Sequence, residues 1–156
     1  MKKNILLLIA GLVLISGCGN PKTETPDVDL DEVVEQIGLM DHGAGLIVFD
    51  MEEVTSRNQN FRTAFWTGSF LQMTLMTLQP GEDIGLELHT VTDQFIRVEE
   101  GEGIVYMGDS EDNLDFVREI KEDFAFFIPA GKWHNLVNTG DKPLKLYSIY
   151  APAEHP

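Results

Sequence analysis

The strongest constraint on the fold is a series of short β-type segments that begins after Gly45 and continues almost to the end of the chain. Runs rich in β-branched and aromatic residues alternate with turn residues, and none has the pattern of a long helix. Together these runs favour an all-β fold that closes into a small barrel or double sheet, because closure hides the strand edges that otherwise aggregate. The predicted strands cover residues 62–67, 71–78, 84–89, 94–99, 103–107, 115–120, 124–128, 133–137 and 144–149.

The first residues of the chain are typical of an export signal. Lys2 and Lys3 precede an apolar run at residues 5–15, which is shorter than the roughly 20 residues needed to cross a bilayer. The run ends in the sequence ISGC at residues 15–18, which resembles the bacterial lipoprotein cleavage box. This resemblance implies cleavage before Cys18 and lipidation of that residue. We therefore expect an extracytoplasmic protein that is attached to a membrane by lipid alone, with an ordinary signal peptide as the alternative.

Composition excludes several classes of partner and site. The chain has a formal net charge of −15, and removal of Lys2 and Lys3 makes it more negative. Such a charge repels phosphate backbones and anionic lipid headgroups, so we expect no nucleic-acid partner. Cys18 is the only cysteine in the sequence. Its lipidation would leave the folded part without a thiol for a disulfide or a thiolate metal site.

The sequence divides into a leader, a tether and one compact domain. We expect a signal peptide at residues 1–17, the lipidated cysteine with a flexible acidic linker at 18–32, and an N-terminal extension at 33–60. A barrel follows at 61–152, and a short tail at 153–156. Within the extension, apolar residues at helical spacing predict a short amphipathic helix over residues 31–40, with Asp31 as its N-cap.

Polar side chains with metal-binding chemistry occur in two separate stretches. Glu87 and His89 lie two residues apart, so they share one face of the predicted strand at 84–89. After a turn, Gln94 can return beside them. The second stretch, PAGKWHNLVN at residues 129–138, begins with a rigid turn and carries His134 on the strand that follows. We therefore expect these four side chains to converge.

These stretches resemble the two sequence motifs of the cupin family, which consists of small jelly-roll barrels with a metal site inside. The spacing of the first motif is kept in full at Gly81, Glu87, His89, Gln94 and Gly101. The second motif matches at Pro129, Gly131, His134 and Asn138, with Asp123 in place of its opening glycine. The resemblance implies a single-domain jelly-roll barrel, comparable to cupins of the phosphomannose-isomerase type.

The resemblance also implies a metal site formed by Glu87, His89, Gln94 and His134. The usual family set has three histidines and one glutamate, whereas here Glu87 replaces a histidine and Gln94 replaces the glutamate. One carboxylate is kept, and it offsets part of the cost of burying a divalent ion. The set suits one divalent Mn, Fe or Zn ion better than Cu. A polar barrel mouth without a metal is the alternative.

Four more side chains are candidates for lining a ligand pocket. Arg62, Trp66, Gln72 and Tyr106 are polar or aromatic groups on predicted strands that can reach a cavity, with ordinary strand packing as the alternative for each. His42 and His155 belong to neither motif, and we expect both to be solvated surface residues.

Outward-facing aromatic residues bear on oligomerisation. Trp133 and Phe95 are expected on the outer faces of their strands, because Trp133 is adjacent to His134 and Phe95 to Gln94. Small cupins commonly pair through such faces, so the resemblance implies a possible homodimer.

Three functions fit this site. The first is metal-assisted isomerisation of a small carbohydrate or oxo-acid, with Glu87 as a base or a metal ligand. The second is a non-catalytic lipoprotein that binds a small ligand or a metal, and the third is an iron-dependent dioxygenase. Each implies a small-molecule ligand or substrate, and the ligand set alone does not separate them.

Overall fold

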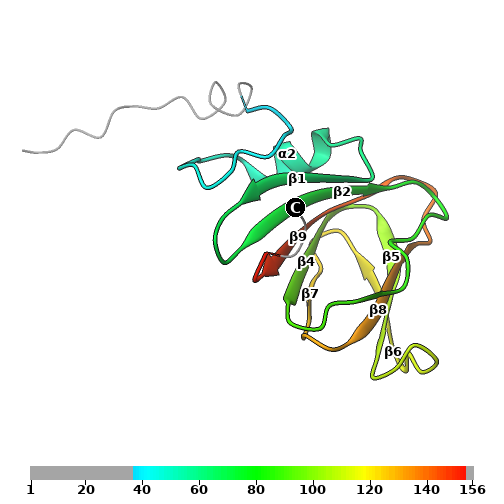
Figure 1. Cartoon of the computed structure of the whole chain (residues 1–156). Coiled ribbons are helices and arrows are strands. Elements are labelled where there is room, and N and C mark those ends of the chain that lie inside the picture. Colours follow the sequence, from blue (N-terminus) through cyan, green and yellow to red (C-terminus); the bar gives the residue numbers. More distant parts are fainter. Residues whose placement is uncertain (1–36, 154–156) are drawn as a thin grey trace, which may run out of the picture.

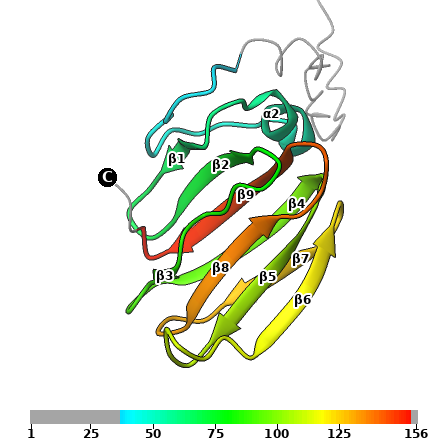
Figure 2. The same ribbon diagram turned by 90° about the vertical axis from the view of Figure 1, so that its right-hand side faces the viewer.

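The computed structural model describes residues 37–153, which fold into two facing antiparallel sheets (Figures 1 and 2). The strand order is β1-β2-β9-β4-β7 in one sheet and β3-β8-β5-β6 in the other. This arrangement confirms the predicted all-β jelly-roll fold. The strands are β1 (Arg62–Thr67), β2 (Gln72–Leu78), β3 (Glu87–Leu88), β4 (Asp93–Glu100), β5 (Glu102–Gly108), β6 (Phe116–Lys121), β7 (Ala125–Ile128), β8 (Trp133–Asn138) and β9 (Leu144–Ala151).

The predicted strands agree with the observed ones to within two residues, except at residues 84–89. There, β3 consists of only Glu87–Leu88. The reason is local, because Gly85 has a φ of +87°, which a strand residue does not adopt. The side chain of Asp83 fixes this bend by accepting a hydrogen bond of 2.7 Å from the Gly85 backbone N–H.

The helix lies in a different place from the predicted one. Residues 31–36 lie outside the described part of the chain, and residues 37–40 are not helical. The observed helix is α2 (Met51–Arg57), which begins after Asp50, whose side chain accepts a hydrogen bond of 3.1 Å from the backbone N–H of Glu53. Its seven residues make only two turns, too few for the apolar periodicity that sequence reasoning requires.

The barrel interior has a polar end and an apolar end. Paired residues on neighbouring strands share a face, so the interior side chains of β2, β9 and β4 form buried rows across the sheet. In order along the barrel, the rows are Gln72-Tyr150-Gln94, Thr74-Ser148-Ile96 and Met76-Leu146-Val98, followed by the pair Leu78-Leu144. The apolar rows pack against residues of the second sheet such as Val105 and Leu136. Each large apolar side chain buried there contributes about 1.5–3 kcal/mol.

A second hydrophobic cluster lies on the outer face of the five-stranded sheet. The residues before α2 lie against β1, while α2 itself contacts β4 and β9 of the same sheet (Figure 1). Phe65 is fully buried there, and its ring meets those of Phe49 and His42 edge-on, with centroids 4.9 and 5.1 Å apart. His42 Nε2 also lies 2.9 Å from the Gly38 carbonyl oxygen. The expectation that His42 is a solvated surface residue is therefore wrong, because the N-terminal extension folds back onto the sheet.

Gly101 shows why the first motif ends in glycine. It lies in the tight turn between β4 and β5 with a φ of +89°. A Cβ atom at this position would lie 2.8 Å from the carbonyl oxygen of Pro143. Both the backbone angle and the close approach of the β8–β9 turn therefore require glycine.

The export signal, Cys18, the acidic linker and His155 all lie outside the described residues. Between residues 37 and 153, no helix combines the length and the apolar character needed to span a membrane.

Candidate metal site

Glu87, His89 and His134 converge at the polar end of the barrel. Glu87 on β3 is the cross-strand partner of His134 on β8, and His89 directly follows β3. Each residue offers a ligand atom within 4.8 Å of the other two. Glu87 Oε2 lies 3.5 Å from His89 Nε2 and 3.8 Å from His134 Nε2. The tertiary structure therefore brings together three of the four residues from which the sequence predicted a metal site.

Gln94 lies beside this cluster and is itself buried. Its Nε2 donates hydrogen bonds to Ser148 Oγ at 2.8 Å and to the Tyr150 hydroxyl at 3.1 Å. The Tyr150 ring in turn packs edge-on against His89, with centroids 5.5 Å apart. Because both amide protons are used, the remaining polar atom of the side chain is Oε1, which accepts no hydrogen bond from residues 37–153.

The two carboxylate oxygens of Glu87 have different neighbours, because Arg62 on β1 binds only one of them. An Arg62 Nη atom lies 2.9 Å from Oε1, while Oε2 faces the two imidazoles. Burial raises the pKa of Glu87, but the contacts with His89 and Arg62 together outweigh that effect and lower the pKa to about 2. Glu87 is therefore a carboxylate at neutral pH, which suits a cation ligand. The same low pKa makes it a weak proton acceptor.

These donors fit a divalent metal ion. The set comprises two imidazole nitrogens, one carboxylate oxygen and one amide oxygen, which are ligands that Mn²⁺, Fe²⁺ and Zn²⁺ accept. The distances from Glu87 Oε2 to the imidazole nitrogens exceed those of good hydrogen bonds. Within residues 37–153, Gln94 Oε1 is a buried acceptor without a donor, an arrangement that costs free energy unless another group satisfies it. A bound cation would satisfy both oxygens.

Two of the predicted pocket residues face the barrel interior. Arg62 pairs across the sheet with Met76, a member of the inner core, and it contacts Glu87 directly. Gln72 is fully buried, pairs with Tyr150 and donates a hydrogen bond of 3.1 Å to Thr67 Oγ1. It therefore lies in the polar row of the interior.

The other two predicted pocket residues face outward. The β1–β2 register shifts between Ala64 and Trp66, and this irregularity places Trp66 in the outer hydrophobic cluster. Its indole N–H donates a hydrogen bond of 2.9 Å to the Gly45 carbonyl oxygen. Tyr106 alternates with the buried residues Val105 and Met107, so it points away from the interior. The expectation that Trp66 and Tyr106 reach the cavity is wrong.

Sequence reasoning did not single out Ser148 and Tyr150. Both lie at alternate positions of β9 after the apolar residues Leu144 and Leu146. The sequence therefore predicts that the two side chains share a face of β9 with these leucines. The pairing of β9 between β2 and β4 decides that this face lies beside His89 and Gln94.

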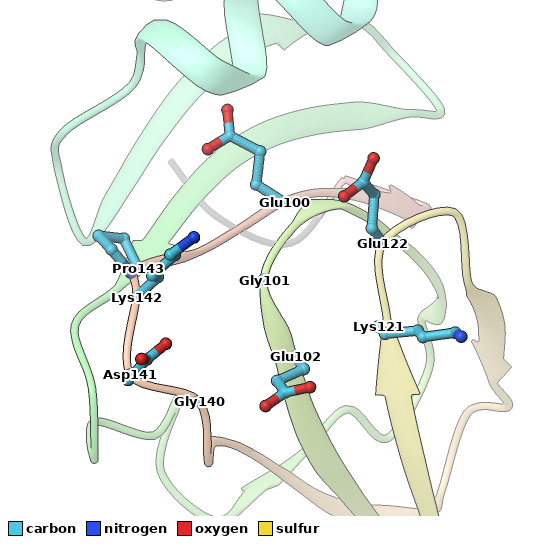
Figure 3. A pocket seen from close by; sticks show the side chains of 9 residues that line it. All are labelled: Glu100, Gly101, Glu102, Lys121, Glu122, Gly140, Asp141, Lys142 and Pro143. Atoms are coloured by element: carbon cyan, nitrogen blue, oxygen red, sulfur yellow. The ribbon is translucent and has the colours of Figure 1, made fainter.

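A separate depression of about 570 Å³ lies at the apolar end of the barrel (Figure 3). Its lining comes from the turns at residues 100–102, 121–122 and 140–143. Figure 3 shows the carboxylates of Glu100 and Glu122 extending to one side and that of Glu102 to the opposite side. Among residues 37–153, only Glu87, His89 and His134 form a cluster of histidine and acidic side chains that could hold a metal ion.

Comparison with known proteins assigns the family. The family model of the Cupin domain matches residues 74–150, which include both motif histidines, Gln94 and Tyr150. The crystal structure of BH2720 from Bacillus halodurans is 59% identical, with a TM-score of 0.74, over 75% of this chain and 89% of that one. The chain belongs to the cupin family.

Relatives of this cupin occur in distant sources. The uncharacterized protein YrkC of Bacillus subtilis is 55% identical over 118 residues, which is 76% of this chain and 63% of that protein. An uncharacterized protein of Acanthamoeba polyphaga mimivirus is 40% identical over 110 residues, which is 70% of this chain and 67% of that protein. This cupin therefore spans less than two thirds of the length of its Bacillus subtilis relative.

Proposed function

We propose that this cupin binds one divalent Mn, Fe or Zn ion through Glu87, His89 and His134, with Gln94 Oε1 as a fourth, weaker ligand. The observation that carries the proposal is the convergence of three ligand atoms within 4.8 Å at the buried polar end of the barrel. Gln94 supports it with a buried amide oxygen that lacks a hydrogen-bond donor among the described residues.

The reaction class that we propose is isomerisation of a small carbohydrate or oxo-acid. A metal ion at this site would supply Lewis-acid polarisation of a carbonyl or hydroxyl oxygen. Glu87 is our candidate to move the proton, because it is the acidic side chain of the cluster and is partly exposed to solvent. Ser148 and Tyr150 hold the Gln94 amide in place through their hydroxyl groups.

The second candidate is a non-catalytic module that binds a small ligand or a metal. The low pKa of Glu87 favours it, because a proton acceptor works best when its pKa lies near the working pH. Incubation of the metal-loaded protein with aldoses, uronates and 2-oxo acids, followed by NMR, separates the two candidates. Formation of an isomer supports the enzyme, whereas binding without turnover supports the module.

Metal content tests the metal site that both candidate functions require. We expect the full-length protein, equilibrated separately with Mn²⁺, Fe²⁺ and Zn²⁺ and then desalted, to retain about one ion per chain, because three ionic or strongly polar ligands preorganise the site. Elemental analysis measures this ratio. A negligible content of all three metals would contradict the proposed function.

We also propose that lipidated Cys18 holds this cupin at a membrane surface outside the cytoplasm. The support is the order of Lys2 and Lys3, the apolar run at residues 5–15 and the cysteine at its end. We expect a Cys18→Ala variant to appear in the soluble fraction instead of the membrane fraction when cells are fractionated. An unchanged distribution would rule out the lipid anchor.

A further inference from the structure

The Arg62–Glu87 ion pair joins the edges of the two sheets next to the candidate metal site. β1 is an edge strand of the five-stranded sheet, and β3 is an edge strand of the four-stranded sheet. Arg62 extends from β1 and contacts Glu87 on β3 at 2.9 Å. Arg62 belongs to neither sequence motif, so the metal-ligand pattern does not account for its position.

Arg62 lies on the solvent side of the cluster. Its side chain is 25% exposed and that of Glu87 is 20% exposed, whereas His89 is 8% exposed and His134 is fully buried. A ligand that approaches the imidazoles from solvent therefore meets Arg62 and Glu87 first.

The guanidinium of Arg62 has donor capacity that its protein contacts do not use. The ion pair with Glu87 uses one Nη atom, while the buried Nε–H donates no hydrogen bond to any residue in the described range 37–153. Adjacent N–H groups of a guanidinium form a planar fork that matches the two oxygens of a carboxylate. The unused donor therefore favours a ligand with an acidic group.

The charge balance at the site favours the same class of ligand. The chain as a whole carries a formal net charge of −15, which repels anions at long range. At the site, Arg62 offsets the charge of Glu87, and a divalent ion would make the local charge positive. This end of the barrel is therefore suited to attract an anion despite the acidic surface around it.

We propose that Arg62 binds the carboxylate of the ligand, so that the ligand class of this cupin is a small 2-oxo or 2-hydroxy carboxylate rather than a neutral sugar. This inference rests on the proposed metal site. Arg62 acts in it as a specificity-determining residue that contacts the ligand and does not bind the metal.

Pyruvate and its neutral isostere pyruvamide test the inference. We expect the full-length, metal-loaded protein to bind pyruvate about ten-fold more tightly than pyruvamide in calorimetric titrations, because a charge-assisted contact to Arg62 is lost with the amide. In Arg62→Gln this preference should disappear. In Arg62→Lys it should fall but persist, because the charge remains and the planar fork is lost.

Arg97→Gln is the matched control, since Arg97 also forms ion pairs, with Glu99 at 2.9 Å and Asp123 at 2.8 Å, and removing it changes the net charge equally. It should keep the full preference for pyruvate. The inference is overturned if wild-type protein shows no preference or if Arg62→Gln keeps it. Should Arg62→Gln fail to fold, an undiminished preference in Arg62→Lys overturns it.

Metal content distinguishes this inference from the proposed function. Elemental analysis of each protein before titration should give the same metal content in wild type, Arg62→Gln and Arg97→Gln, because neither arginine is a ligand. Absence of metal from wild type contradicts the proposed function. Metal present without a preference for pyruvate contradicts only the role of Arg62.

Discussion

Replacing His134 with alanine is expected to lower the affinity for divalent metal by more than about 100-fold, because loss of a direct ligand exceeds the effect of losing an outer-shell partner. His134 is fully buried, and its Nε2 lies 3.8 Å from Glu87 Oε2. Alanine removes one of the two imidazoles and leaves a space at the same point. Equilibrium dialysis of the full-length variant, followed by elemental analysis, measures the change.

His42→Ala is the control for this prediction. His42 is also partly buried and contacts Phe65 and the Gly38 carbonyl, but it lies on the outer face of the sheet. It should retain the metal affinity of wild type. Wild-type affinity in His134→Ala, or an equal loss in both variants, would contradict the assignment of His134 as a ligand.

Replacing Phe65 with alanine is expected to lower the free energy of unfolding by about 3–5 kcal/mol. Phe65 is fully buried in the outer hydrophobic cluster, where it contacts Phe49 and His42 from the N-terminal extension. Its removal leaves a cavity under the segment at residues 37–57. Urea unfolding measures the loss, and limited proteolysis should show faster cleavage within that segment.

Phe127→Ala gives the same chemical change at a site that is 73% exposed. Its ring contact with Phe95, at 5.0 Å between centroids, contributes about 0.5–1.5 kcal/mol. Phe127→Ala should therefore cost much less than Phe65→Ala. Equal losses of unfolding free energy in the two variants would show that packing of residues 37–57 on Phe65 does not stabilise the barrel.

The two-residue period of side chains made most of the barrel predictable. It defined the strands. It also placed Glu87 and His89 on the same face of one strand, and it placed His134, Leu136 and Asn138 on the same face of a second strand. The prediction failed for Trp66, because an irregularity in the β1–β2 pairing breaks that period. The position of the helix was also predicted wrongly, because the seven residues of α2 are too few to show a helical pattern.

Which side chains carry lone pairs, and which face of its own strand each one occupies, can be predicted from the sequence, because both depend on neighbours within a few residues. Two contacts follow from the folded chain alone: Arg62 meets Glu87, 25 residues away, and Tyr150 lies between Gln72 and Gln94. These contacts depend on which strands pair and which sheet edges face each other. Long-range burial of apolar surface sets that choice, and no local pattern encodes it.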